Sequence, residues 1–100
     1  MINKGEEWLL FIMTAINDQR LNVWHLALLS ALAQLAYLQN ETNVIRVSRR
    51  KLMQFSHIST LPTFHKYFKE LQQKGYIKYT PSYHPGYHST VELLINRVKL

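Results

Sequence analysis

The 100-residue sequence has no cysteine, few glycines and prolines, and little negative charge. Without cysteine, disulfides, thiolate zinc sites and thiol catalysis are excluded. Three glycines and three prolines are too few for a linker or a disordered chain. The six acidic residues, with Asp18 the one aspartate, provide no carboxylate cluster, and there is no glycine-rich phosphate loop. These absences indicate a folded domain and disfavour an enzyme.

Long uninterrupted apolar runs are also missing. Thirteen of the sixteen residues from 23 to 38 are apolar. However, His25, Ser30 and Gln34 interrupt them short of the roughly 18 residues that a membrane span needs. Two glutamates near the N-terminus stand where a secretion signal carries positive charge. We therefore expect a cytoplasmic protein that has no contact with a membrane.

Positive charge is in excess, and it is concentrated in the second half of the chain. The formal net charge is +6 and the isoelectric point is about 9.8. Residues 1–43 carry two basic and four acidic residues, whereas residues 44–100 carry ten basic and two acidic residues. A chain of this length makes one domain. We expect residues 1–43 to be a helical scaffold and residues 44–100 to bind a polyanion.

The scaffold part has the pattern of two helices. Glu6 and Glu7 precede an apolar run, as acids in a first helical turn do, which predicts a helix over about residues 5–17. Asn22 can cap a second helix that ends at a left-handed Asn40. This second helix is apolar on most faces, which predicts a central position. We expect the two helices also to form a homodimer contact; the alternative is that the second helix is only the core of a monomer.

A short strand and a helix with a basic start open the second half. Residues 44–47 are rich in β-branched residues, and Ser48 can cap a helix that runs to about His57. The first turn of this helix carries the three cations Arg49, Arg50 and Lys51. Cations there oppose the helix dipole, so a bound phosphate would explain them, although a charge run is also found on solvated faces.

A second helix of this part follows a break at residues 58–60. Pro62 lies near its start and Gly75 just past its end. Three apolar residues at helical spacing, Phe64, Phe68 and Leu71, should face the core. The positions left toward solvent are Thr63, His65, Lys66, Lys69 and Gln73.

The last part of the chain predicts a β-hairpin. Residues 76–79 and 91–95 have strand patterns, and the prolines and glycine of residues 80–89 favour a turn. The expected tip carries Tyr83, His84, Tyr87 and His88. Aromatic and imidazole groups favour stacking and hydrogen bonding there. The spacing of His84 and His88 permits zinc ligands, but without a nearby cysteine or acid we expect no metal and no cofactor.

Helix, turn, basic helix and hairpin in this order make the winged form of the helix-turn-helix, an α+β and mainly helical fold. The segment from Ser48 to Ile77 resembles bacterial winged-helix DNA-binding proteins. The resemblance is carried by Leu52, Ser59-Thr60, Thr63-Phe64-His65-Lys66, Lys69-Glu70-Leu71 and Lys74-Gly75-Tyr76-Ile77. More narrowly, residues 75–85 are similar to a wing segment of small proteins from bacterial conjugative and transposable elements.

The resemblance implies a single winged-helix domain that binds double-stranded DNA. It implies DNA contacts by Thr60, Thr63, His65, Lys66 and Lys69, and backbone contacts by the wing. We expect a transcriptional regulator or a mobile-element accessory factor, specific or architectural in its binding, with no small-molecule effector evident. The alternatives are a protein-interaction module, because winged helices also dock proteins, and RNA or single-strand binding.

Overall fold

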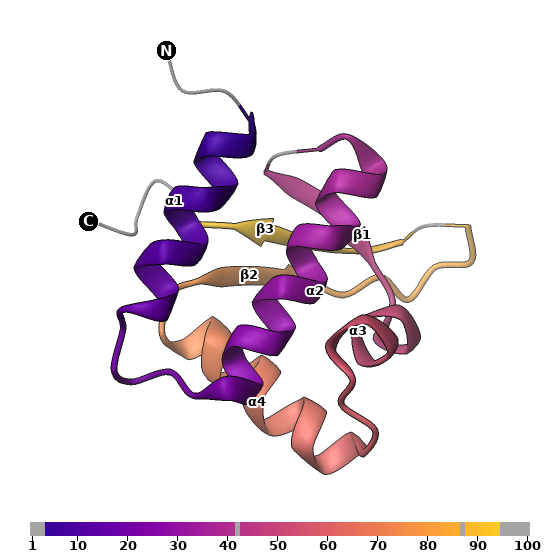
Figure 1. The fold of residues 1–100 in the computed structure, drawn as a ribbon. Helices are drawn as coiled ribbons and strands as arrows, with labels where there is room; N and C mark the ends of the chain where they lie inside the picture. Colours follow the sequence, from indigo (N-terminus) through magenta and orange to yellow (C-terminus); the bar gives the residue numbers. More distant parts are fainter. Residues whose placement is uncertain (1–3, 42, 87, 95–100) are drawn as a thin grey trace.

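A computed structural model describes residues 4–41, 43–86 and 88–94. Within them the chain forms an α+β, mainly helical fold (Figure 1). In chain order the elements are α1 Lys4–Ile16, α2 Val23–Gln39, β1 Val44–Val47, α3 Arg49–Ser56, α4 Leu61–Gln73, β2 Ile77–Thr80 and β3 Ser89–Leu93. The predicted order of elements is confirmed, and most ends differ by a residue or two because helix and strand ends fray. The expected end of the last strand, Ile95, lies outside the described residues.

Local capping accounts for where the helices begin and end. The Asn22 side chain accepts hydrogen bonds from the backbone at the start of α2, and Asn40 ends this helix in the left-handed conformation with φ of 54°. The Ser48 hydroxyl caps α3 by accepting from the Lys51 amide over 3.2 Å. Gly75 has φ of 83° and turns the chain from α4 toward β2. The predicted caps at Asn22, Asn40 and Ser48 are therefore confirmed.

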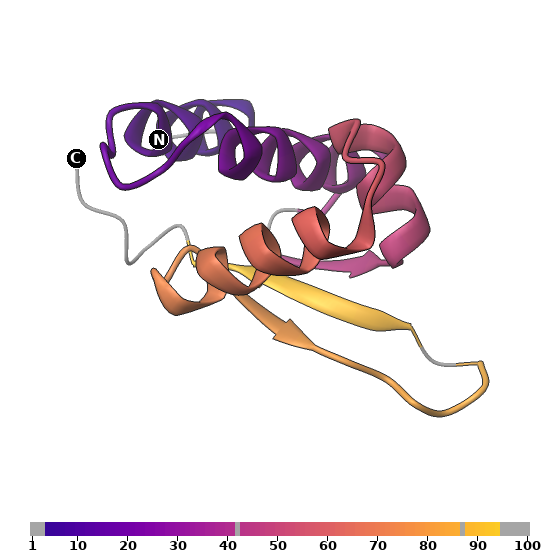
Figure 2. The ribbon, with the colours of Figure 1, turned by 90° about the horizontal axis from the view of Figure 1, so that it is seen from below.

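The three strands form one antiparallel sheet in the order β1-β3-β2. Ile45 and Tyr79 both pair with Val91, and Ile77 pairs with Leu93. These positions form the face that packs on the helices, and the residues between them face outward. The β2–β3 hairpin extends beyond the rest of the molecule, as Figure 2 shows at the lower right.

Helix α2 is the centre of the core. It contacts α1, α3, α4 and β1. Seven of its residues are buried: His25, Leu28, Leu29, Ala31, Leu32, Leu35 and Ala36. In Figure 2, α1 and α2 form an upper layer, and α4 lies between that layer and the hairpin. The predicted central position of this helix is confirmed.

A buried histidine joins α2 to α4. The Asn22 amide donates to His25 Nδ1 over 2.9 Å, so the His25 proton is on Nε2, which donates to Glu70 Oε1 over 2.7 Å. The His25 ring also meets Tyr67 edge-on, with ring centroids 4.9 Å apart. One side chain thus completes the capping box of α2 and holds α4 in place. Sequence reasoning had treated His25 only as an interruption in an apolar run.

No helix in the described ranges is long and apolar enough to span a membrane.

Candidate nucleic-acid interface

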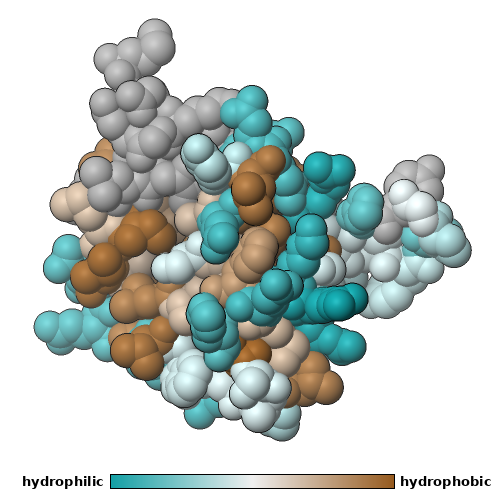
Figure 3. Space-filling view, turned by 45° about the vertical axis from the view of Figure 1, so that its right-hand side comes forward, coloured by the Kyte–Doolittle hydropathy of each residue, from teal (hydrophilic) through white to brown (hydrophobic). Residues whose placement is uncertain are grey.

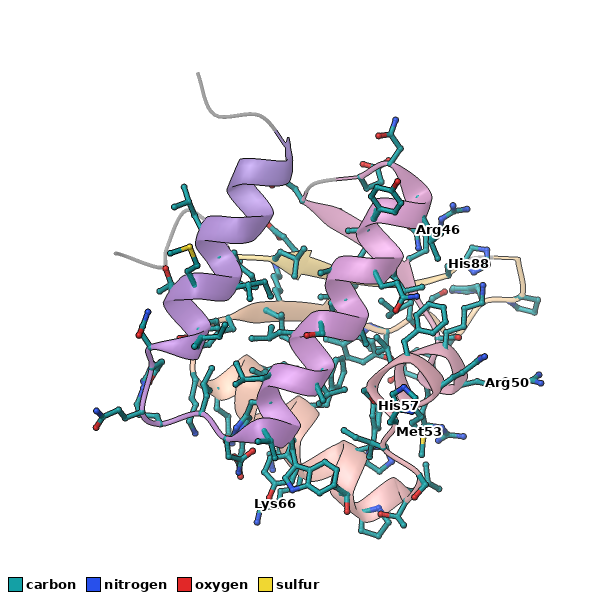
Figure 4. All side chains as sticks on the ribbon, viewed as in Figure 1. Arg46, Arg50, Met53, His57, Lys66 and His88 are labelled. Atoms are coloured by element: carbon teal, nitrogen blue, oxygen red, sulfur yellow. The ribbon has the colours of Figure 1, made fainter. Side chains whose placement is uncertain are left out.

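The first turn of α3 presents its backbone amides and three cationic side chains in one place. Arg49, Arg50 and Lys51 are all exposed, and this turn contains no acidic residue. Figure 4 shows Arg50 pointing away from the molecule, on the side where the hairpin extends. The positive end of the helix dipole adds to the field of the side chains. The arrangement favours an anion such as a phosphate.

Helix α4 divides into a buried face and a basic exposed face. Phe64, Phe68 and Leu71 are buried, as their spacing predicts. Among the outward positions, His65, Lys66, Lys69 and Gln73 are exposed, which is confirmed as well. The exposed face of α4 therefore offers two lysines and an imidazole to a ligand in solution.

Two threonines near the start of α4, Thr60 and Thr63, are less available to a ligand than the sequence indicates. The Thr60 hydroxyl donates to the Thr63 hydroxyl over 2.8 Å, and the Thr60 side chain makes no capping bond to the backbone. Thr63 is half-buried, contrary to the expectation that it faces solvent. It lies on the same side of α4 as Tyr67, four residues on, and Tyr67 packs against Trp24 and His25 of α2. Thr60 remains exposed at the N-cap.

The Lys66 side chain rests on an aromatic pair that sequence reasoning left unassigned. Its Nζ lies 5.2 Å from the centre of the Tyr67 ring, and Tyr67 stacks on Trp24 with ring centroids 6.2 Å apart. Trp24 is 41% exposed at the start of α2. In Figure 4, Lys66 points away from the molecule at the lower edge. The cation–π contact favours one position of a lysine that would otherwise move freely.

A hollow between α3, α4 and the base of the hairpin brings two of the predicted residues together. Its volume is about 190 Å³, and its polar lining residues are Ser48, Arg49, His65 and Ser89. Arg49 and His65 thus belong to one surface although they come from different helices. The described residues that line it include no aspartate or glutamate.

A second hollow, of about 380 Å³, lies on another side of the start of α3. One of its lining residues is Arg46, a basic residue that the sequence analysis did not select as a binding residue. Arg46, Lys51 and His88 line it together. The Gln39 side chain accepts from the Arg46 amide over 2.9 Å and donates to the Arg46 carbonyl over 2.8 Å, which fixes the outer edge of β1. Figure 4 shows Arg46 and His88 on the same side of the molecule. In the sequence, Arg46 stands between the β-branched residues Ile45 and Val47 of the expected strand, and this alternation was the available sign that Arg46 faces outward.

The tip of the hairpin is exposed and polar. Tyr83, His84 and His88 line one shallow depression with Thr80 and Thr90, and Tyr83 is 88% exposed. Tyr87 lies outside the described residues. In the part of the chain that the structure describes, no group of three or more side chains of the metal-binding types comes together. The described tip residues thus offer rings and hydrogen-bonding groups, as expected.

The two acidic residues of the second half, Glu70 and Glu92, lie away from the start of α3. Glu70 bonds to His25 and lies 4.0 Å from Lys74, whereas Glu92 stands opposite Lys78 in the register of β2 and β3, on the outer face of the sheet. In Figure 3, hydrophilic side chains gather toward the side from which the hairpin extends. The start of α3 and the exposed face of α4 are therefore basic and uncompensated by these acids. Comparisons of the chain with protein-family models, with curated proteins and with solved structures found no match.

Proposed function

We propose that this protein binds double-stranded DNA as a winged helix, with α4 as the recognition helix and the β2–β3 hairpin as the wing. The element order and the β1-β3-β2 sheet support this assignment. The observation that carries it is the basic surface around the start of α3. The cations of that surface and of the neighbouring α4 face are Arg46, Arg49, Arg50, Lys51, Lys66 and Lys69.

The proposed mechanism combines shape with charge. An α-helix fits the major groove, which is about 12 Å wide, and α4 would enter it with Lys66 and Lys69 toward phosphates or guanine edges. Arg49, Arg50 and Lys51 would fix the register by binding phosphates, which carry position rather than sequence information. The exposed side chains of the hairpin would contact the neighbouring backbone. Arg46 joins this set because it lines the same hollow as Lys51.

We also propose that α1 and α2 join two copies of the chain, as in a dimeric regulator or an accessory factor of a mobile element. Among the side chains of these helices that the structure describes, six large apolar ones are exposed: Met13, Ile16, Val23, Trp24, Tyr37 and Leu38. Exposed apolar side chains in such numbers favour a protein contact. The same residues favour the second candidate function, a module that docks a different protein without binding DNA.

Salt dependence separates these functions. Fluorescence anisotropy of a labelled random duplex, titrated at low and at physiological salt, should show binding that weakens steeply as salt rises, because several phosphate contacts release counterions. Apolar docking would respond little to salt. Absence of duplex binding at low salt would overturn the DNA proposal, and stronger competition by a single strand than by a duplex would assign the surface to single-stranded nucleic acid.

A further inference from the structure

The hollow between α3, α4 and the hairpin is a small aromatic cavity. Below its polar mouth it is lined by Val47, Leu52, Phe64, Phe68 and Tyr79. Phe64 and Phe68 stack with ring centroids 5.2 Å apart, and Tyr79 meets Phe68 edge-on at the same distance. Leu52, Phe64 and Phe68 are buried in the core, so this wall is held by the packing of the whole domain.

The size of the cavity suits a single ring. A cavity of about 150 Å³ lined by apolar side chains holds benzene. The present cavity, at about 190 Å³, has room for one six-membered ring with a small substituent, and lies below the range of roughly 300–1,000 Å³ of sites for drug-sized ligands. Edge-to-face and offset contacts with Phe68 and Tyr79 are available to such a ring.

The mouth of the cavity favours a negative charge on that ring. Arg49 stands there at the start of α3, with the hydroxyls of Ser48 and Ser89 and the imidazole of His65 beside it. The described lining residues carry no acid that would compete for the Arg49 guanidinium. A guanidinium binds a carboxylate through two parallel hydrogen bonds, which a neutral group of the same shape cannot match.

We propose that this cavity binds a small aromatic carboxylate, with the ring among the aromatic side chains and the carboxylate on Arg49. We further propose that this ligand weakens DNA binding, a second step that rests on the function proposed above. The ligand would neutralise Arg49 and cover His65, which are two of the groups assigned to DNA. The coupling is reciprocal, so DNA would lower the affinity for the ligand by the same factor.

Benzoate is the probe for the cavity, titrated into ¹⁵N-labelled protein and followed by NMR. Saturable shifts should be confined to amides around the cavity, in the first turns of α3 and α4 and at the base of the hairpin. Arg49→Gln should weaken benzoate about tenfold, because a charge-assisted pair is lost. The matched control is Arg50→Gln, which removes the same charge from the next residue, outside the cavity lining, and should leave benzoate affinity unchanged.

Benzamide supplies the same ring without the charge and should bind about tenfold more weakly than benzoate. Shifts that do not saturate, or equal weakening by Arg49→Gln and Arg50→Gln, would show general attraction of an anion to a basic protein and overturn the cavity site. Near-unchanged proton and nitrogen chemical shifts elsewhere in the two variants would establish that both remain folded.

The regulatory step has its own experiment, duplex binding measured by anisotropy at constant ionic strength with sodium benzoate replacing sodium acetate. Benzoate should lower duplex affinity severalfold, whereas acetate, which lacks the ring, should not. Equal effects of the two salts would overturn the regulatory step. If the protein binds benzoate but no duplex, the DNA function and its regulation fail together while the cavity site stands.

Discussion

The Tyr76 hydroxyl donates a hydrogen bond to Asp18 Oδ2 over 2.6 Å, across 58 residues of chain. The same carboxylate binds the Arg20 guanidinium at 2.7 and 3.0 Å. Asp18 lies in the turn after α1, and Tyr76 lies between α4 and β2, with its ring against Phe11 of α1. The contact therefore attaches the N-terminal helices to the part of the chain that carries the candidate DNA surface.

Acid should weaken the fold through Asp18. The hydrogen bonds from Arg20 and then from Tyr76 hold the pKa of the Asp18 carboxyl well below its usual 3.8. Because the folded pKa is depressed, this contribution to the free energy of unfolding is complete above about pH 5 and is lost progressively as pH falls through 3.8 toward the folded pKa. The free energies of unfolding of wild type and Asp18→Asn, measured with urea, should converge as pH is lowered.

Glu92→Gln removes a carboxylate from the outer face of the sheet and serves as the control for charge. A constant difference between wild type and Asp18→Asn from pH 7 down to pH 2 would contradict the assignment.

High pH should also weaken the fold, through ionisation of Tyr76. Burial, and then the hydrogen bond to Asp18, raise the pKa of Tyr76 to about 12. Because the folded pKa lies above the ordinary 10.0, the stabilisation is present below pH 10 and is lost as pH rises toward 12. Tyr76→Phe should lose about 1.5–3 kcal/mol at pH 7, the value of a hydrogen bond to a charged group. Because the chain has six tyrosines, the absorbance titration of Tyr76→Phe is subtracted from that of wild type to isolate the Tyr76 phenol, and urea unfolding measures the stability. A difference titration centred at the ordinary 10.0 would refute the raised pKa.

Removing His25 should destabilise the protein, because this side chain links α2 to α4. His25→Phe leaves the Asn22 amide and the Glu70 carboxylate without their shared partner, at a cost of about 2–3 kcal/mol. For a domain of this size, each kcal/mol lowers Tm by about 4–8 °C. Glu70→Gln keeps an oxygen acceptor for His25 Nε2 and should cost less. Calorimetry that finds the two variants equally stable would remove the special role of His25.

Lys66 and Lys69 on α4 should contribute to DNA affinity and contribute little to the stability of the fold. Lys66→Ala with Lys69→Ala should reduce the slope of log affinity against log salt by about 2, close to one per phosphate contact. Tm should fall only slightly, because both side chains are exposed and Lys66 loses one cation–π contact.

Lys78→Ala is the matched control, since Lys78 is an exposed lysine on the outer face of the sheet. It should change neither the salt slope nor the affinity. Unchanged binding by the double variant would place the recognition surface elsewhere.

The apolar side chains of α1 and α2 predict self-association. Sedimentation at tens of micromolar protein should show a dimer, and Ile16→Glu with Val23→Glu should give a monomer, because both side chains are largely exposed, at 60% and 71%. Tyr83→Glu, on the equally exposed hairpin tip, should leave the dimer intact. A wild-type monomer under these conditions would rule out the contact.

Much of the architecture is legible from short-range patterns. Asn22, Ser48 and Asn40 mark helix ends because capping depends on hydrogen bonds within three or four residues. The spacing of Phe64 and Phe68 identifies the buried face of α4 because a helix repeats every 3.6 residues. The basic start of α3 needs no tertiary information at all.

Contacts between distant residues were not foreseeable in this way. The partners of His25 and Tyr76 lie 45 and 58 residues away, and Arg46 and His88 line one hollow because β1 pairs with β3. The aromatic cavity is formed by side chains from two helices and the sheet. Local hydrogen bonding and periodicity determine each helix and strand. Which side chains come into contact depends on how these elements pack, and residues close in sequence carry no information about that packing.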